Sequence, residues 1–170
     1  GGQAHHLLEL SEELPEPEKI AEPLNKRKVL IIEDDNDIRE FLKEEVGVYF
    51  EVEVAADGTS GFEKARTYDA DLIICDVLMP GMTGFEVTKK LKSDFATSHI
   101  PIILLTAKTT IESKLEGLEY GADDYITKPF SATYLQARVE NLLMQRKKLQ
   151  NFYRDSLTHV TVSETPVAQG

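Results

Sequence analysis

Four short apolar runs in the sequence are closely followed by polar residues with reactive or metal-binding side chains. The runs cover residues 29–32, 72–75, 100–105 and 125–126, and the polar residues after them are Glu33 and Asp34, Asp76, Thr106 and Lys128. Uninterrupted apolar runs are typical of strands buried on both faces of a parallel sheet. Because the carboxyl ends of parallel strands open into one crevice, the sequence predicts that these polar side chains lie together.

Segments with helical spacing of apolar residues separate the runs. Their apolar stripes, each typical of a helix that packs on a core, comprise Ile38, Phe41 and Leu42; Phe62 and Ala65; Ile111, Leu115 and Leu118; and Leu135, Val139, Leu142 and Leu143. Thr83, Thr110 and Ser131 are expected to cap helices. Residues 50–55 alternate with a period of two, which favours a strand at the sheet edge. Five strands alternating with five helices predict an α/β, flavodoxin-like, doubly wound (βα)5 sandwich whose parallel five-stranded sheet has the order 2-1-3-4-5.

The segments on either side of this pattern differ from it in composition. Residues 1–26 combine acids with Pro15, Pro17 and Pro23 and are predicted to form a linker. Residues 27–147 form the predicted domain, and residues 148–170 a helical extension through Leu149, Phe152 and Tyr153 followed by a C-terminal linker. Since the chain does not begin with Met and has linker-like ends, we expect it to be a fragment of a longer protein.

Composition narrows the classes of function. The 19 basic and 30 acidic residues give a net charge of −11, which disfavours direct nucleic-acid binding by this segment. Cys75 is the sole cysteine, so an intrachain disulfide is excluded. No apolar stretch approaches the roughly 18 residues of a membrane span, and no signal peptide is visible. We therefore expect a cytoplasmic segment without membrane contact, which leaves open a membrane anchor elsewhere in the parent protein.

The clustered acids point to a divalent cation. Carboxylates brought together repel one another, and Mg²⁺ prefers a few protein oxygens together with water and phosphate. Asp34 and Asp76 are the expected direct ligands of Mg²⁺ or Mn²⁺, with Glu33 orienting a bound water. The alternatives are Ca²⁺, although EF-hand spacing is absent, and acids that only cap a helix, a role better suited to Asp35 and Asn36.

Asp76 is also a candidate nucleophile. It lies between apolar residues, which should hold it rigidly at the crevice floor. A carboxylate in that position can attack phosphorus in line and form an aspartyl phosphate. Lys128 would then pair with one phosphoryl oxygen, and the hydroxyl of Thr106 would donate to another.

These residues give the chain a specific resemblance. Residues 29–35 (VLIIEDD), 71–84 (DLIICDVLMPGMTG), 101–107 (PIILLTA) and 121–130 (GADDYITKPF) resemble the receiver (response-regulator phosphoacceptor) domain of two-component signalling over roughly residues 27–147. The resemblance implies Asp76 as phosphoacceptor, Glu33 and Asp34 as the acid pair, Thr106 and Lys128 as phosphate partners and the carbonyl of Leu78 as a further metal ligand. It also implies a cis Lys128–Pro129 bond and, as phosphoryl donor, a histidine kinase or phosphotransfer domain.

The resemblance further implies a switch. Thr106 is drawn toward the phosphoryl group, and Tyr125 turns inward into the vacated space. The surface made by the fourth helix, fifth strand and fifth helix changes as a result. Leu78, two residues after Asp76, cannot orient an attacking water, and Lys108 is long and basic, so we expect slow autodephosphorylation and no enzymatic turnover.

The kind of receiver stays open. Residues 106–118 (TAKTTIESKLEGL) are similar to receivers of hybrid sensor histidine kinases, whereas a stand-alone response regulator is the alternative. Lys114, Asp123, Asp124 and Arg138 resemble a charged face through which one receiver subfamily dimerises, but Tyr134 replaces an expected acid. A phosphorylation-dependent homodimer is therefore left undecided.

Three rival functions carry less weight. A Mg²⁺-dependent aspartyl-nucleophile phosphatase would commonly need an acid at Leu78. A flavin-binding electron carrier would need a glycine- and hydroxyl-rich loop where this chain has Glu33 and the acids after it. A degenerate scaffold receiver would have lost chemical residues, whereas all are present here.

Overall fold

The computed structural model describes residues 26–108 and 110–169, with side chains described as far as Leu157. Apart from Lys26, the predicted linker over residues 1–26 lies outside this part of the chain. Five strands form one parallel sheet: β1 (Lys28–Ile32), β2 (Glu51–Ala55), β3 (Leu72–Cys75), β4 (Ile102–Thr106) and β5 (Asp124–Thr127). Their order is β2-β1-β3-β4-β5, which confirms the predicted topology and places β2 at an edge.

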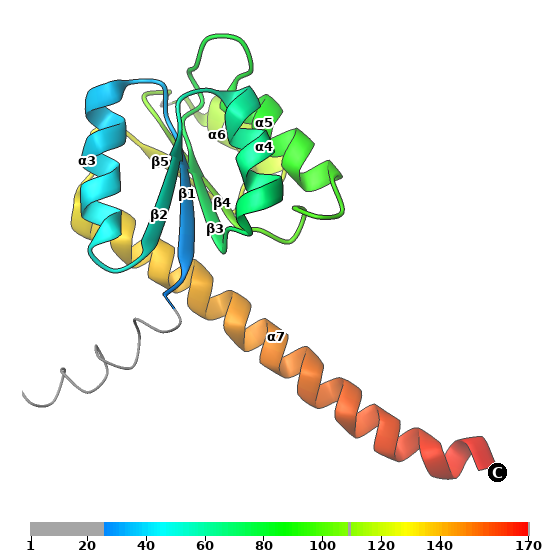
Figure 1. Cartoon of the computed structure of the whole chain (residues 1–170). Helices are drawn as coiled ribbons and strands as arrows, with labels where there is room; N and C mark the ends of the chain where they lie inside the picture. Colours follow the sequence, from blue (N-terminus) through cyan, green and yellow to red (C-terminus); the bar gives the residue numbers. More distant parts are fainter. Residues whose placement is uncertain (1–25, 109, 170) are drawn as a thin grey trace, which may run out of the picture.

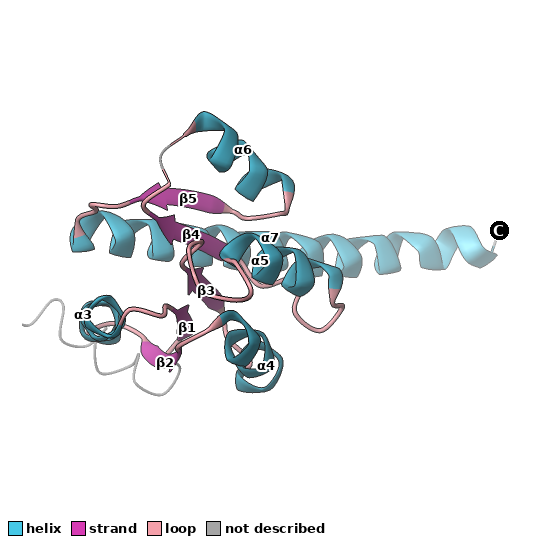
Figure 2. Cartoon of the chain, turned by 90° about the horizontal axis from the view of Figure 1, so that it is seen from above, coloured by secondary structure: helices cyan, strands magenta, loops and turns pink. Residues whose placement is uncertain are grey.

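Helices cover both faces of the sheet (Figures 1 and 2). They are α3 (Asn36–Gly47), α4 (Gly58–Tyr68), α5 (Gly84–Ser93), α6 (Ile111–Glu119) and α7 (Ala132–Gln169). Alternate residues of each central strand point to opposite faces. Leu30 and Ile73 belong to the core beneath α4 and α5, whereas Ile31 and Ile74 belong to the core beneath α3 and α7. The central strands are therefore buried on both faces, as their uninterrupted apolar runs predicted.

Side chains at the helix starts fix where each helix begins. Asp35 accepts from the amides of two residues in the first turn of α3, and Thr83 forms a capping box with Glu86 at α5. Thr110 and Ser131 accept amide hydrogen bonds at the starts of α6 and α7, so the three predicted hydroxyl caps are confirmed. These hydrogen bonds satisfy amides that have no partner within the helix.

The predicted packing of α6 is wrong. Its apolar stripe does not face the core: the side chains of Ile111, Leu115 and Leu118 are 73%, 55% and 43% exposed. The helix instead approaches the sheet through Gly117, where a Cβ atom would lie 2.9 Å from a Leu104 methyl carbon. A glycine contact lets the helix sit close to the strands, and this turns the bulky stripe outward.

Helix α7 is much longer than the domain. Its first turns pack on the sheet through Leu135, Val139 and neighbouring apolar residues, and the helix then runs on past the sheet to Gln169 (Figures 1 and 2). It therefore continues beyond Leu157, where the apolar pattern ends. Even this helix lacks an apolar stretch that could cross a bilayer, and the same is true of every other helix in the described residues.

Candidate phosphoacceptor site

Sheet hydrogen bonds extend past the strand ends and position the polar residues. The amide of Glu33 donates to the carbonyl of Ala55 at 3.0 Å, and the amide of Asp76 donates to the carbonyl of Ile32 at 3.0 Å. On the other side, the amide of Lys128 donates to the carbonyl of Thr106 at 2.7 Å. The backbones that carry the site are thus tied to rigid strands, which suits a site that depends on geometry.

Three carboxylates meet where β1 and β3 end. Glu33, Asp34 and Asp76 each offer an oxygen within 4.8 Å of the others. The side chains of Glu33 and Asp76 are buried, whereas Asp34 is exposed and leaves the cluster open to solvent. All three donors are hard oxygen ligands, which matches the preference of Mg²⁺. The structure therefore brings the three predicted acids together.

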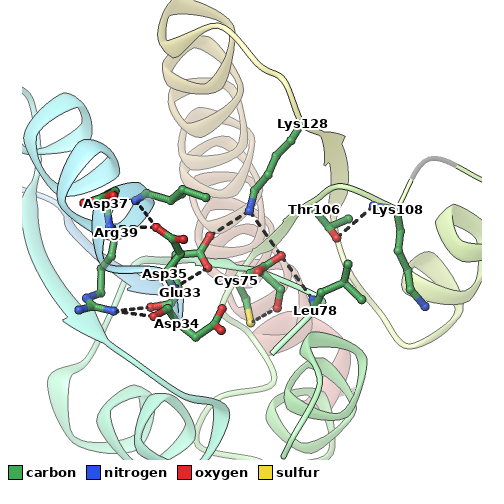
Figure 3. Close-up of polar contacts among 12 residues, drawn as sticks. Glu33, Asp34, Asp35, Asp37, Arg39, Cys75, Leu78, Thr106, Lys108 and Lys128 are labelled. Atoms are coloured by element: carbon green, nitrogen blue, oxygen red, sulfur yellow. Dashed lines mark hydrogen bonds and ion pairs between the residues drawn. The ribbon is translucent and has the colours of Figure 1, made fainter. Parts of the chain in front are cut away.

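Lys128 is the cation opposite these acids. Its Nζ lies 3.0 Å from Glu33 Oε1 and 3.7 Å from Asp76 Oδ1, and its side chain is 19% exposed. Figure 3 shows Lys128 extending from its strand end toward Glu33. One ammonium group thus opposes three carboxylates, so the pocket retains an excess of negative charge that a divalent cation would offset.

Burial changes the protonation of Glu33. Loss of water around the carboxyl group raises its pKa to about 7, and the nearby Asp76 carboxylate adds to this, although the hydrogen bond from Lys128 lowers it. Ionising a buried carboxylate costs free energy, and a neighbouring cation offsets that cost. The raised pKa of Glu33 is thus a second sign that the acid cluster suits a metal ion.

The backbone packs tightly around Asp76. The amide of Leu78 donates to Asp76 Oδ1 at 3.4 Å. A Cβ atom on Gly84 would lie 2.2 Å from the carbonyl oxygen of Asp76, so only glycine allows α5 to begin there. Cys75 is buried beside it, and burial raises the pKa of its thiol far above the usual range, so the residue serves as a small buried apolar side chain and not as a reactive thiol.

Thr106 and Tyr125 are connected through the loop after β4. Thr106 is fully buried, and its Oγ1 accepts from the amide of Lys108 at 3.3 Å. Tyr125 is 5% exposed and donates its hydroxyl to the carbonyl of Lys108 at 3.0 Å. The Lys108 ammonium lies over the Phe85 ring, 5.6 Å from its centroid. Lys108 thus links the two predicted switch residues through its backbone.

Sequence reasoning missed several of these contacts. It paired Lys128 with a phosphoryl oxygen but not with Glu33, and it assigned no role to Gly84. It also overlooked Arg39, whose guanidinium donates to the carbonyls of Glu33 and Asp34 at 2.9 and 3.3 Å and so holds the loop after β1 (Figure 3). The only signal of this contact in the sequence was the presence of a basic residue one turn after the start of α3.

The remaining predictions on the site concern the peptide bond before Pro129 and the roles of Leu78, Thr106 and Tyr125. The Lys128–Pro129 bond is cis, as the resemblance implied. The side chain of Leu78 is 49% exposed. The role of its carbonyl as a metal ligand stays a prediction, as do the roles of Thr106 and Tyr125.

The sequence of this chain is similar to those of known proteins. Residues 29–140 match the response regulator receiver domain. The chain is 42% identical over 134 residues to hybrid signal transduction histidine kinase D of Dictyostelium discoideum, a match that covers 79% of this chain and 9% of that protein. It is 44% identical over 119 residues to the transcriptional regulatory protein CusR of Escherichia coli K12, which covers 68% of this chain and 51% of that protein.

A solved structure agrees with these matches. The chemotaxis protein CheY4 of Vibrio cholerae has 37% identity and a TM-score of 0.65, with 68% of this chain and 98% of that chain covered. The chain spans about a tenth of the histidine kinases and about half of the transcriptional regulators that it matches. Receiver domains receive signals from histidine kinases or phosphotransfer proteins and are not a family of turnover enzymes. With the fold, the strand order and the acidic crevice in agreement, this chain belongs to the receiver domain family of two-component signalling.

Proposed function

We propose that this domain accepts a phosphoryl group from a phosphohistidine onto Asp76. The observation that carries the proposal is the placement of the buried Asp76 carboxylate in an acid cluster, 3.7 Å from the ammonium of Lys128. A nucleophile held between a cation and a potential metal site is the arrangement that phosphoryl transfer needs.

The transfer forms one bond and breaks another. A carboxylate oxygen of Asp76 attacks phosphorus, the phosphorus–nitrogen bond of the donor breaks, and the released imidazole takes up a proton from solvent. Lys128 exchanges part of its contact with Glu33 for a phosphoryl oxygen. The Thr106 hydroxyl gives up its contact with the Lys108 amide and donates to a second phosphoryl oxygen.

The proposed cofactor is Mg²⁺, or Mn²⁺ in its place. Glu33, Asp34 and Asp76 would hold it, together with the carbonyl of Leu78. When bound, the ion supplies positive charge that offsets the acids and the phosphoryl oxygens. The lifetime of the aspartyl phosphate is proposed to extend well beyond seconds, because Leu78 offers no group that orients water.

The proposed output is a change in the surface of α6, β5 and α7. Movement of Thr106 toward the phosphoryl group would release the amide of Lys108, whose carbonyl holds the Tyr125 hydroxyl. This loop therefore couples the crevice to α6. A coupling of this kind is a local charge event with a wider conformational response.

Dimerisation through that surface is a second part of the proposal. The exposed stripe of Ile111, Leu115 and Leu118 offers apolar area. The charged residues are less available, since Arg138 already pairs with Asp124. Asp123 likewise pairs with Lys92, so we expect the apolar stripe to contribute more than salt bridges across the interface.

The proposed context is a hybrid histidine kinase in which this segment is cytoplasmic, with a histidine kinase or phosphotransfer domain as donor. The similarity to a hybrid kinase supports it, and a stand-alone response regulator is the alternative that the similarity to CusR represents. The net charge of −11 favours protein partners over nucleic acid for this segment.

The test is incubation of the chain with acetyl phosphate and Mg²⁺, followed by intact mass measurement. We expect the wild type to gain one phosphoryl group and Asp76→Ala to gain none. Circular dichroism of both proteins controls for folding. A wild-type chain that is folded and gains no mass would refute the proposal.

A further inference from the structure

Beyond the sheet, α7 exposes a row of large apolar side chains. Leu149, Phe152 and Tyr153 are 51%, 64% and 58% exposed. Spacings of three and four residues place them on one side of the helix, and Leu149 follows the buried Leu142 by seven residues. The row thus continues the stripe that packs on the domain. A helix with an apolar stripe is typically covered by another segment.

The charge next to this row restricts what can cover it. At about 100° per residue, Arg146 and Lys148 lie on the two flanks of this row, and among residues 146–155 the only acid is Asp155. A second copy of this helix would bring like charges together, which is costly at an interface. The chemistry therefore favours an acidic segment with apolar residues of its own.

Such a segment is present near the start of the same chain. Residues 7–18 contain Leu7, Leu8, Leu10 and Leu14 together with five glutamates, and they contain no basic residue. These residues lie outside the described part of the structure. Their composition is the complement of residues 146–153 in both charge and apolar content.

The described chain begins, and α7 leaves the domain, at the same end of the sheet. The chain enters the sheet at Lys28, whose amide donates to Asp71 at 2.8 Å, and α7 projects past the same end of the sheet (Figure 1). About 16 residue steps separate Leu10 from Lys26, and an extended chain of that length reaches roughly 50 Å. Residues 146–153 occupy only about 11 Å of helix, so the connection is long enough.

We propose that residues 7–18 dock on the exposed face of α7, with their leucines on Leu149, Phe152 and Tyr153. Their glutamates then pair with Arg146 and Lys148, which flank this row. The docked segment covers an apolar face of α7 that would otherwise be exposed to water. The proposal is independent of phosphoryl transfer at Asp76, so either can fail alone.

The first experiment is carbodiimide cross-linking of the full chain, with the linked peptides mapped by mass spectrometry. We expect links from Lys148 to Glu9, Glu12 or Glu13 within monomers. The partly exposed pair Lys64–Glu53, at 3.1 Å, serves as positive control. If that pair is linked and no link joins the two segments, the proposal is wrong.

A charge swap supplies the second experiment. The triple variant E9K/E12K/E13K should speed hydrogen exchange over residues 149–157 about tenfold, and adding R146E/K148E should restore the wild-type rate. The matched control E40K/E44K on the exposed side of α3 should change nothing there. Unchanged exchange in the triple variant, or no restoration in the combined one, would overturn the proposal. Protection that depends on protein concentration, with a dimer mass by light scattering, would assign the face to a second copy instead.

Discussion

The crevice at the ends of β1 and β3 and the α6 side of the sheet are built in opposite ways. In the crevice, Glu33 and Asp76 are buried, tied to strand backbones and held by Lys128. On the α6 side, one helix touches the sheet through Gly117 and leaves its large apolar residues in solvent. From this difference we expect the crevice to hold the chemistry and the α6 side, with few buried side chains, to respond to it.

Removing the cation of the crevice should have the largest effect. Lys128→Gln leaves Glu33 and Asp76 without their counter-charge and removes a partner for the phosphoryl group. Loss of one such electrostatic contact typically lowers the rate of transfer by about 100-fold or more. The rate of labelling by acetyl phosphate measures this.

The matched control for Lys128→Gln is Lys64→Gln, which removes a partly exposed lysine of α4 that pairs with Glu53 and not with the acids of the crevice. It should label at the wild-type rate. Equal rates for both variants would mean that the charge of the crevice does not control the reaction.

Tight packing around Asp76 predicts the next largest effect. In Gly84→Ala the new methyl group meets the Asp76 carbonyl oxygen at 2.2 Å, which should lower the free energy of unfolding by about 3 kcal/mol. Gly81→Ala is the comparison, because Gly81 has a φ of 76° and no atoms near its Cβ position. It should cost only about 1 kcal/mol through backbone strain. Urea unfolding of both variants measures the difference, and equal costs would show that the contact at Gly84 relaxes.

The pKa of Glu33 predicts a pH dependence of stability. Its pKa of about 7 in the fold lies above the ordinary value of 4.5, so the folded state binds the extra proton. The resulting stabilisation is complete below pH 4.5 and is lost as the pH rises through 7, by about 1 to 3 kcal/mol.

Urea unfolding of wild type and Glu33→Gln in EDTA, across this pH range, isolates the contribution of Glu33. The free energy of unfolding of the wild type should fall relative to that of Glu33→Gln as the pH rises from 4.5 to 7. A constant difference would mean that folding does not raise the pKa of Glu33.

The α6 side predicts the smallest effect on stability. Leu115→Ala removes an exposed side chain and should change the free energy of unfolding by less than about 0.5 kcal/mol. Leu104→Ala removes a fully buried side chain of β4 and should cost about 2 to 5 kcal/mol. Thermal or urea unfolding of the pair tests whether α6 is as weakly packed as its exposure indicates. Similar losses in both would contradict the contrast between the two regions.

Sequence reasoning succeeded where a run of one class of residue is enough to determine the local structure. Buried strands need continuous apolar runs, so the strands, their order and the meeting of Glu33, Asp34 and Asp76 were predictable. It failed at α6, because helical spacing identifies an apolar stripe but not which neighbour it faces. Gly117, which has no side chain to contribute to a stripe, decides that orientation.

Contacts between distant residues were also beyond the sequence. Lys128 and Glu33 are 95 positions apart in the sequence, and only the folded structure reveals that their side chains meet. The continuation of α7 past Leu157 was hidden for a different reason, since the sequence there has no apolar period. The fold was therefore predictable in outline, and the pairings that tune the site were not.

The position of the phosphoryl group in the chain is the sharpest test of Asp76 as the phosphoacceptor. The chain is treated with acetyl phosphate and Mg²⁺, the acyl phosphate is reduced with borohydride, and the peptides are sequenced by mass spectrometry. We expect homoserine at position 76 and no reduced residue at any other acid. Homoserine at Asp34, 5-hydroxynorvaline at Glu33, or no reduced residue in a folded and phosphorylated chain would contradict it.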